Sequence, residues 1–416
     1  MVELLAPAGD MEKLKTAVRY GADAVYFGGE FGLRKASGNF SINEIRDAIK
    51  YLHENNCKGY LTLNIYAHNY DLDPLNDYLN MIKDIPIDAF IVSDPGVLLL
   101  IREILGDVEI HLSTQANTTN YLAARFWIDN GISRIVTARE MSLPEIKKLK
   151  SEIGENVIIE SFVHGAMCMS YSGRCLLSNF MTGRDANKGA CTHPCRWKYR
   201  LVEEERTGEY YPVTEDERGT YILNSKDLCM IDSIPIMIES GIGSFKIEGR
   251  NKSSYYVATV LSAYRAAIDS YLSNPSEYTF NEKWMEELNK ASHREFSHGF
   301  YYNKPTEDDS TYDTSDYIRE YSFIGVIRDF DKDSGFATIE QRNKFVKGDK
   351  IEIFGPVREM FDLYENGVFF VEEIVDEMYD ENNNIIESAP HPKQIIKIKL
   401  KNIVKPGFIM RKRESE

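Results

Sequence analysis

Short apolar runs alternate with amphipathic helical patterns along the first two-thirds of the chain. The apolar runs predict buried strands at residues 3–5, 24–27, 59–63, 89–92, 109–112, 134–136, 157–162 and 244–247. Between them, segments such as INEIRDAIKYLHENN and GVLLLIREIL repeat apolar residues at the three- and four-residue spacing of a helix. Eight such strand–helix units predict an α/β protein built on a TIM-type (β/α)8 barrel, closed by a helix over residues 255–272.

An open, doubly wound sheet is the competing interpretation of the same alternation. Such a sheet seldom needs eight consistent units, and no GxGxxG sequence opens the first unit here. One predicted helix also has its own start signal in SLPEIKKLKSEI. Ser142 stands three residues before Glu145, which is the spacing of a capping box, and Pro144 lies in the first turn. The barrel is the favoured fold.

Polar residues follow the predicted strands, at the points where a barrel would gather them on its carboxyl face. Barrel enzymes place their active sites on that face. The residues are Pro7-Ala8-Gly9, Gly28-Gly29, Asn64, Ser93-Asp94, Gln115-Ala116-Asn117, Arg139-Glu140, His164-Gly165 and Glu248-Gly249-Arg250.

The pattern changes beyond residue 275, so we expect a barrel over 1–275, a linker with one helix over 276–318, and a second domain over 319–416. Short strands separated by turns predict that the second domain is a small antiparallel β-barrel. Its closing strands concentrate basic residues that are candidates for contact with a nucleic-acid backbone. These are Lys393, Lys397, Lys399, Lys401, Lys405, Arg411, Lys412 and Arg413.

Composition and charge limit the classes of function. The chain has 416 residues and a formal net charge of −16, which argues against sequence-independent nucleic-acid binding over the whole surface but leaves room for a local basic patch. MVELLAPAGDMEKLK does not resemble a signal peptide, and no run approaches eighteen apolar residues. We therefore expect a cytoplasmic protein with no membrane contact, in a reducing compartment where clustered cysteines favour metal over disulfide.

Five of the six cysteines gather within about sixty residues, in a loop predicted at 164–230 that leaves the barrel after the seventh strand. Six residues separate Cys168 from Cys175, fifteen separate Cys175 from Cys191, and three separate Cys191 from Cys195, with Cys229 further on. An iron–sulfur cluster is the favoured interpretation. Zinc usually takes paired short knuckles, and only Cys191–Cys195 has that spacing. Unligated thiols are the third possibility. Four ligands leave Cys195 or Cys229 spare.

His164, Glu248 and Arg250 are the candidate catalytic residues. His164 follows an apolar strand, and it either packs beneath the cysteine loop or serves the site. Arg250 in KIEGRNKSS can bind a carboxylate or phosphate in bidentate fashion, or it pairs with Glu248 for stability. Glu160 lies within the seventh strand, where it is a candidate structural acid. No H-E-x-x-H, G-x-S-x-G or Walker sequence occurs.

Several of these segments together resemble the peptidase U32 family over nearly the whole chain. They are ELLAPAGDMEKLKTAVRYGADAVYFGG, HLSTQAN, ESFVHGAMCMSYSGRC, CTHPCRWKY, LNSKDLC and FKIEGRNKSSYY. Within that family the sequence is most similar to members that hydroxylate tRNA, making 5-hydroxyuridine at the wobble position with prephenate and a cluster. Relatives hydroxylate a ribosomal-RNA cytidine or the ubiquinone ring without molecular oxygen.

The resemblance implies a 4Fe-4S cluster on Cys168, Cys175, Cys191 and Cys229, although one branch of the family uses a cysteine that resembles Cys195. It implies an RNA-modification enzyme whose partners are the anticodon region of tRNA and a small anionic co-substrate, prephenate. The alternatives are a collagenase-like peptidase, which the family name suggests, and hydroxylation of another RNA or aromatic ring. The sequence leaves open whether a second subunit or a homo-oligomer is needed.

Overall fold

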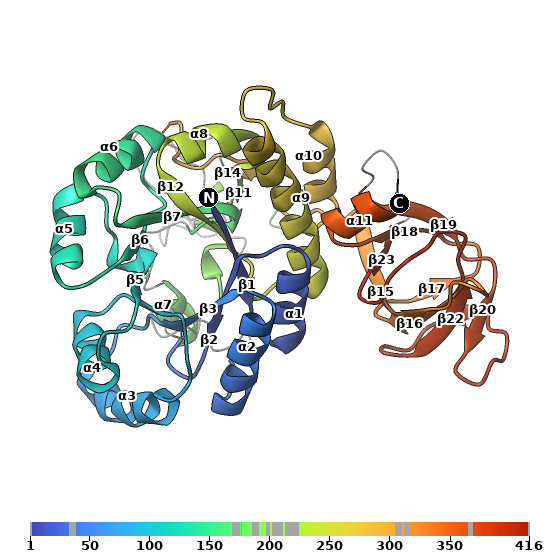
Figure 1. Cartoon of the computed structure of the whole chain (residues 1–416), viewed down its shortest axis with the longest axis horizontal. Helices are drawn as coiled ribbons and strands as arrows, with labels where there is room; N and C mark the ends of the chain where they lie inside the picture. Colours follow the sequence, from blue (N-terminus) through green and yellow to red (C-terminus); the bar gives the residue numbers. More distant parts are fainter. Residues whose placement is uncertain are drawn as a thin grey trace.

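The computed structural model of the chain describes residues 2–32, 39–168, 175, 177–184, 191–196, 200–201, 211–212, 224–303, 310–311, 317–364 and 369–414. Figure 1 shows a barrel of strands ringed by helices, with a second, β-rich domain beside it. Helices α9 and α10 lie on the side of the barrel that faces the second domain.

Eight parallel strands form the barrel, which is closed because β12 pairs with β1 on one side and with β7 on the other. The strands are β1 (Glu3–Ala8), β2 (Ala24–Gly28), β3 (Lys58–Leu63), β4 (Ala89–Val92), β5 (Ile110–Leu112), β6 (Arg134–Val136), β7 (Ile158–Ala166) and β12 (Ile242–Ile247). The TIM-type barrel predicted from the sequence is confirmed. All eight strands lie where the apolar runs placed them, and β7 extends further than predicted, to Ala166.

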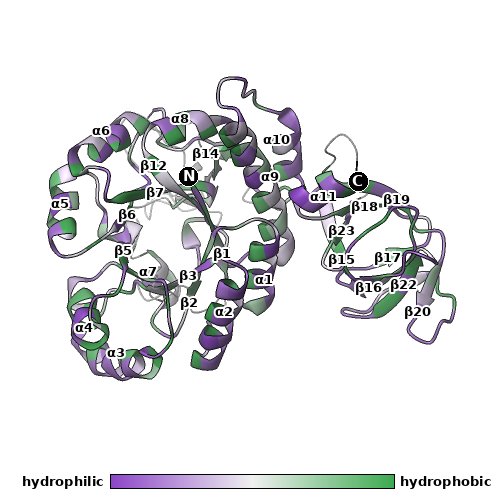
Figure 2. Cartoon of the chain, viewed as in Figure 1, coloured by the Kyte–Doolittle hydropathy of each residue, from purple (hydrophilic) through white to green (hydrophobic). Residues whose placement is uncertain are grey.

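Helices cover the outside of the barrel, and Figure 2 shows hydrophilic and hydrophobic residues side by side on them. They are α1 (Met11–Arg19), α2 (Ile42–Glu54), α3 (Asn69–Ile82), α4 (Pro95–Leu105), α5 (Tyr121–Asp129), α6 (Leu143–Ile153), α8 (Ile234–Glu239), α9 (Ser254–Ser273) and α10 (Glu282–Asn289). The capping box predicted for α6 is present, with the Ser142 N–H donating to Glu145 Oε2 at 2.8 Å. None of the helices within the described ranges is long and apolar enough to cross a membrane.

The cysteine-rich segment between β7 and β12 is described only in part. It contains α7 (Leu177–Thr182), the short pair β8 (Arg200–Leu201) and β9 (Tyr211–Pro212), and β11 (Asp227–Cys229). Two-residue strands β10 (Asn224–Ser225) and β14 (Ser310–Thr311) pair with each other, and β13 (Phe296–Ser297) pairs with β11. Most of the insertion predicted at 164–230 lies outside the described residues.

Charged side chains, rather than apolar layers alone, fill part of the barrel interior. Glu160 of β7 is fully buried, with Oε1 2.6 Å from Lys246 Nζ of β12 and Oε2 3.1 Å from Arg134 Nη1 of β6. Arg134 also pairs with Glu3 of β1, which accepts a 2.7 Å hydrogen bond from the Tyr60 hydroxyl of β3. The network links five of the eight strands, so Glu160 is a structural acid.

The cations determine the ionisation of Glu160. Burial disfavours its charged form, but attraction to Lys246 and then to Arg134 outweighs that effect and lowers the pKa of Glu160 to about 2. A carboxyl with a depressed native pKa stabilises the fold above its unfolded pKa, and that stabilisation is lost as the pH falls towards the native pKa.

We therefore predict that the difference in the free energy of unfolding between the wild type and Glu160→Gln depends on pH. The wild type should be more stable by a constant amount above pH 4.5, and its advantage should shrink between pH 4.5 and about pH 2, where Glu160 becomes protonated. Urea unfolding at a series of pH values measures this. A difference that stays constant down to pH 2 would contradict the assignment.

The second domain is a seven-stranded antiparallel sheet in the order β19-β18-β23-β15-β16-β22-β20. Its strands are β15 (Tyr321–Phe330), β16 (Phe336–Gln341), β18 (Lys350–Phe354), β19 (Val371–Ile374), β20 (Met378–Asp380), β22 (Ile395–Lys399) and β23 (Ile409–Arg413). Helix α11 (Val357–Leu363) and the pair β17 (Phe345–Val346) and β21 (Ser388–Ala389) complete it. In the described residues the edge strands β19 and β20 do not pair with each other, so the predicted closed barrel is corrected to a half-barrel.

Arg411 of β23 anchors the half-barrel to the barrel domain. Its guanidinium is fully buried, with Nη2 2.9 Å from Glu287 Oε2 of α10 and Nε 2.7 Å from Glu352 Oε2 of β18. Lys290, which follows α10, shares the second carboxylate, with Nζ 2.9 Å from Glu352 Oε2. Nearby, the Tyr20 hydroxyl donates to the Phe354 carbonyl at 3.3 Å. The two domains therefore share a desolvated ionic contact.

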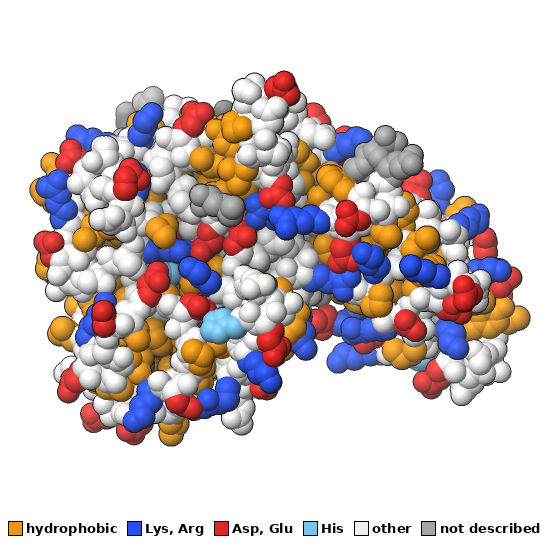
Figure 3. Space-filling model, viewed as in Figure 1, with side chains coloured by type: hydrophobic (Ala, Val, Ile, Leu, Met, Phe, Trp, Pro, Cys, Tyr) orange, Lys and Arg blue, Asp and Glu red, His pale blue; other side chains and the backbone are white. Residues whose placement is uncertain are grey.

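Other basic residues of the closing strands also have acidic or polar partners. Lys412 pairs with Asp349, Lys405 with Glu359, Arg413 with Glu320, and Lys397 donates to Asn383. Figure 3 shows Lys and Arg side chains interspersed with Asp and Glu over the visible face. The expectation that these strands form a free basic surface is wrong for Arg411, because a buried, paired guanidinium cannot contact an RNA backbone.

Arg411 and Arg413 make a matched pair for testing this anchor, since both are arginines on β23 but the Arg413 side chain is 72% exposed. Arg411→Met should cost about 3–5 kcal/mol, because it leaves two carboxylates without their buried partner. Arg413→Met should cost less than about 1 kcal/mol. Chemical unfolding of the full chain gives both values, and equal losses would show that Arg411 is not the anchor.

Candidate active site

The seam between β7 and β12 brings the sequence-predicted site residues together at the carboxyl face of the barrel. The Glu248 N–H donates to the His164 carbonyl at 2.8 Å, so His164 near the end of β7 and Glu248 just after β12 lie side by side. Gly165 makes this close approach feasible, since a Cβ at that position would lie 2.4 Å from the Glu248 carbonyl oxygen.

His164 is buried among aromatic rings. Its ring centroid lies 5.4 Å from that of Phe296, 5.5 Å from that of Tyr264 and 6.0 Å from that of Tyr256. Burial, assisted by the nearby charges of His293 and Lys252, lowers the pKa of His164 to about 3. The imidazole is therefore neutral near pH 7. Its Nδ1 has no hydrogen-bond partner among the described residues, so it offers one uncommitted polar atom.

Arg250 points back across the mouth towards the end of β2. Its Nη2 donates to Asn39 Oδ1 at 3.1 Å, and its side chain is almost fully buried. Gly28 leaves the space that the guanidinium occupies, because a Cβ there would lie 2.6 Å from Arg250 Nη1. The sequence of β2 therefore ends in glycine at a point where any side chain would displace Arg250.

Two further cations reach the same mouth. Arg139, which follows β6, stacks over the Phe162 ring at 4.1 Å and lies 3.8 Å from Glu248 Oε2. Lys246 Nζ lies 4.4 Å from the centroid of Tyr26 while it holds Glu160. The sequence placed Arg139 on the carboxyl face without choosing it as a catalytic residue, and it did not indicate Lys246. Alternation along β12 was the available signal, because Lys246 and Glu248 must face the same side.

The loop after β5 adds polar groups that lack partners. Gln115 Oε1 accepts from Asn64 Nδ2 at 2.7 Å and from the Ser113 hydroxyl at 3.2 Å. Its Nε2, like Arg139 Nε, has no hydrogen-bond partner within the described chain. A buried donor without an acceptor costs about 1–3 kcal/mol. The mouth of the barrel therefore suits a ligand rich in acceptor oxygens, such as a carboxylate.

The cysteine-rich segment starts at the carboxyl end of β7, and its cysteines differ in exposure. Cys168 is exposed, Cys175, Cys191 and Cys195 are half-buried, and Cys229 is buried beneath the site. Cys229 pairs with His164 in the β11–β7 ladder, and its Sγ lies 3.9 Å from the Tyr264 hydroxyl. The described residues contain no group of three or more His, Cys, Asp or Glu placed to hold a metal.

The donor set nevertheless has the chemistry that a cluster needs. Iron–sulfur clusters are held by thiolates, and four of the cysteines flank segments that lie mostly outside the described residues. Burial raises the pKa of the Cys229 thiol to about 12, so a metal would have to displace its proton. The choice between Cys195 and Cys229 as fourth ligand stays a prediction.

Family models match both domains of the chain. The model described as peptidase family U32 matches residues 9–311, and the model described as peptidase family U32 C-terminal domain matches residues 319–411. Together the two matched segments contain the barrel, the cysteine-rich segment and the half-barrel. They cover far more than half of the sequence.

Characterised and uncharacterised relatives align over most of the chain. The tRNA hydroxylation protein P1 of Bacillus subtilis is 42% identical over 411 residues, which cover 99% of this chain and 94% of that protein. The tRNA hydroxylation protein P of Escherichia coli is 35% identical, with 85% of this chain and 86% of that protein covered. An uncharacterized protease of Methanocaldococcus jannaschii is 38% identical, with coverages of 98% and 97%.

Proposed function

This chain belongs to peptidase family U32, and from that premise we propose that it is an RNA-modification enzyme that makes 5-hydroxyuridine at the wobble position of tRNA. In this proposal the reaction depends on an iron–sulfur cluster, uses prephenate and needs no molecular oxygen. The observation that carries the proposal is the 42% identity to a tRNA hydroxylation protein over 99% of the chain.

The wobble base is a suitable substrate for a site at the mouth of a barrel. Bases in an anticodon loop are single-stranded, so one base can be splayed into a pocket at a modest unstacking cost. Hydroxylation replaces a C–H bond of the ring with C–OH, which requires an oxygen donor and an electron acceptor. Side chains supply neither, so the proposal requires a co-substrate and a redox centre.

The cations of the mouth support an anionic co-substrate such as prephenate. Arg139 and Arg250 present guanidinium groups that can bind carboxylates in bidentate fashion. The carboxylate of Glu248 lies against Arg139, and Gly28 leaves the space that the Arg250 guanidinium occupies. His164, neutral at the pH of the cell, would hold one hydrogen bond to a bound ligand at Nδ1 rather than deliver a positive charge.

In the proposal, Cys168, Cys175, Cys191 and Cys229 hold a 4Fe-4S cluster above this mouth. When bound, the cluster would supply one-electron transfer, which none of the side chains of the mouth can perform. The position of Cys229 next to His164 supports a cluster near the carboxyl face. The protein's own part in the reaction is to bind the two substrates, orient them and exclude water.

A peptidase is the rival function, because one relative, whose alignment with this chain covers 97% of its length, is named an uncharacterized protease. Peptide hydrolysis needs an activated nucleophile or a metal-bound water. No hydroxyl or thiol in the described residues is hydrogen-bonded to His164 Nδ1, and Glu248 lies against Arg139. These contacts favour binding of an anion over activation of a nucleophile.

We predict that protein purified without oxygen contains about four iron atoms and four sulfides, as a 4Fe-4S centre requires. Alanine substitution of Cys168, Cys175, Cys191 or Cys229 should each remove the visible absorption, whereas Cys195→Ala should retain most of it. Cys57→Ala is the matched control, since Cys57 is buried in the barrel domain outside the cysteine-rich segment. Colourless anaerobic protein with stoichiometric zinc would refute the cluster, and loss of colour in Cys195→Ala but not in Cys229→Ala would change the fourth ligand.

Deletion of the gene should replace hydroxyuridine-derived wobble nucleosides with uridine, as read by mass spectrometry of digested tRNA. Wild-type protein should restore the modification, and Arg250→Ala should restore much less of it while keeping its iron, because this arginine acts on a bound anion. Unchanged wobble nucleosides in the deletion strain, with no second homologue present, would contradict the proposed function. Cleavage of gelatin by cluster-free protein, abolished by a point substitution, would favour the peptidase.

A further inference from the structure

A second cavity lies beside the eighth barrel strand, between the start of α9 and the segment that leads into the half-barrel. Its volume is about 500 Å³. Ala166 at the end of β7 and Glu248 connect it to the barrel mouth, and His193 reaches it from the cysteine-rich segment. The cavity therefore adjoins the candidate active site without being part of the cation set already described there.

Two cations, Lys252 and Arg319, stand among the described residues that line this cavity. Lys252 Nζ donates to the Ser292 carbonyl at 3.1 Å and lies 3.9 Å from the centroid of Tyr317. Arg319 is exposed and also lines the cavity. Glu248 is the one carboxylate in the described lining, and Arg139 lies against it. A positive cavity in a chain of net charge −16 is suited to an anion.

Backbone pairing holds residues 317–319, which include Arg319, in place. The Ile318 N–H donates to the His293 carbonyl at 2.7 Å, and the His293 N–H donates to the Ile318 carbonyl at 3.3 Å. This bridge fixes Tyr317 and Arg319 over the cavity, although they belong to the entry into the other domain. In TIM barrels, loops after the last two strands often bind phosphate.

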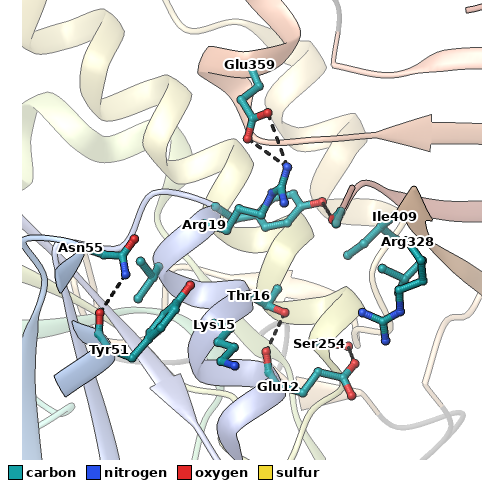
Figure 4. Close-up of a pocket in the computed structure, with 14 residues that line it drawn as sticks. Glu12, Lys15, Thr16, Arg19, Tyr51, Asn55, Ser254, Arg328, Glu359 and Ile409 are labelled. Carbon is teal, nitrogen blue, oxygen red and sulfur yellow. Dashed lines mark hydrogen bonds and ion pairs between the residues drawn. The ribbon is translucent and has the colours of Figure 1, made fainter. Parts of the chain in front are cut away.

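A groove on the other side of the α9 start extends the same path. Ser253 lines the cavity and the next residue, Ser254, lines the groove, which has a volume of about 670 Å³. Figure 4 shows the groove, with α1 on one side, Arg19 reaching Glu359, and Arg328 on the half-barrel side. The groove lining carries three cations, Lys15, Arg19 and Arg328, and two carboxylates, Glu12 and Glu359, so positive charge is in excess by one. Two adjacent cavities suit an extended strand better than a single small anion.

We propose that Lys252 and Arg319 bind a phosphodiester group of the RNA strand next to the modified nucleotide, and that the groove along α1 receives the continuation of that strand. The inference rests on the proposed function, because it takes RNA as the polyanion. It places phosphate recognition at the junction of the two domains rather than on the basic closing strands, whose Arg411 is buried and paired.

Binding of a labelled anticodon stem-loop by the full-length protein tests the proposal. Fluorescence anisotropy at several salt concentrations should show a shallower salt dependence for Arg319→Gln and for Lys252→Gln, by about 0.7–0.9 in the slope of log K against log salt for each lost contact. Arg358→Gln is the matched control, since this arginine is 78% exposed and lies outside both cavities. Its slope should equal that of the wild type.

Because Arg319 is exposed, Arg319→Gln keeps the test valid if Lys252→Gln fails to fold. Unchanged RNA affinity and slope in Arg319→Gln would overturn the proposal, and a raised KM for prephenate in that variant would instead assign the cavity to the small anion. If the two variants show the slope changes given above while the wild type binds RNA but does not hydroxylate it, this inference stands and the proposed function is refuted.

Discussion

The ion pair between Lys246 Nζ and Glu160 Oε1, 2.6 Å long, spans the seam where β12 closes the barrel against β7. Both ends of this contact are buried, and Arg134 ties it to β6 and β1. Because the two strands are held in this register, His164 and Glu248 emerge side by side at the carboxyl face. The cysteine-rich segment leaves from the same strand β7, so a cluster held by that segment would adjoin the substrate site.

Charge is used differently in the two domains. In the half-barrel, basic residues that look like an RNA surface in the sequence mostly serve internal contacts, and Arg411 joins the domains through Glu287 and Glu352. At the barrel mouth, by contrast, Arg139 Nε is buried and has no hydrogen-bond partner within the described residues, so a bound ligand could accept from it.

The sequence predicted the barrel well because buried parallel strands leave apolar runs whose ends are visible, and all eight runs fall on observed strands. The capping box at Ser142 was also predictable, because its two residues, Ser142 and Glu145, are only three positions apart in the sequence. What the sequence could not reveal were pairings between distant residues. Arg411 and Glu287 are 124 positions apart, so nothing in the basic strand indicated burial. Helix α11 and the open edge of the half-barrel were missed for the same reason, since both depend on packing against the other domain and along the sheet.

Photo-crosslinking tests most directly where the RNA base meets the protein. An anticodon stem-loop that carries 4-thiouridine at the wobble position would be irradiated with the full-length protein, and the linked peptides identified by mass spectrometry. The account predicts crosslinks to the carboxyl ends of β7 and β12 and to the segment that opens α9. Crosslinks confined to strands β16 and β22 of the half-barrel would contradict it, because the base would then lie far from the cations and the polar groups of the barrel mouth.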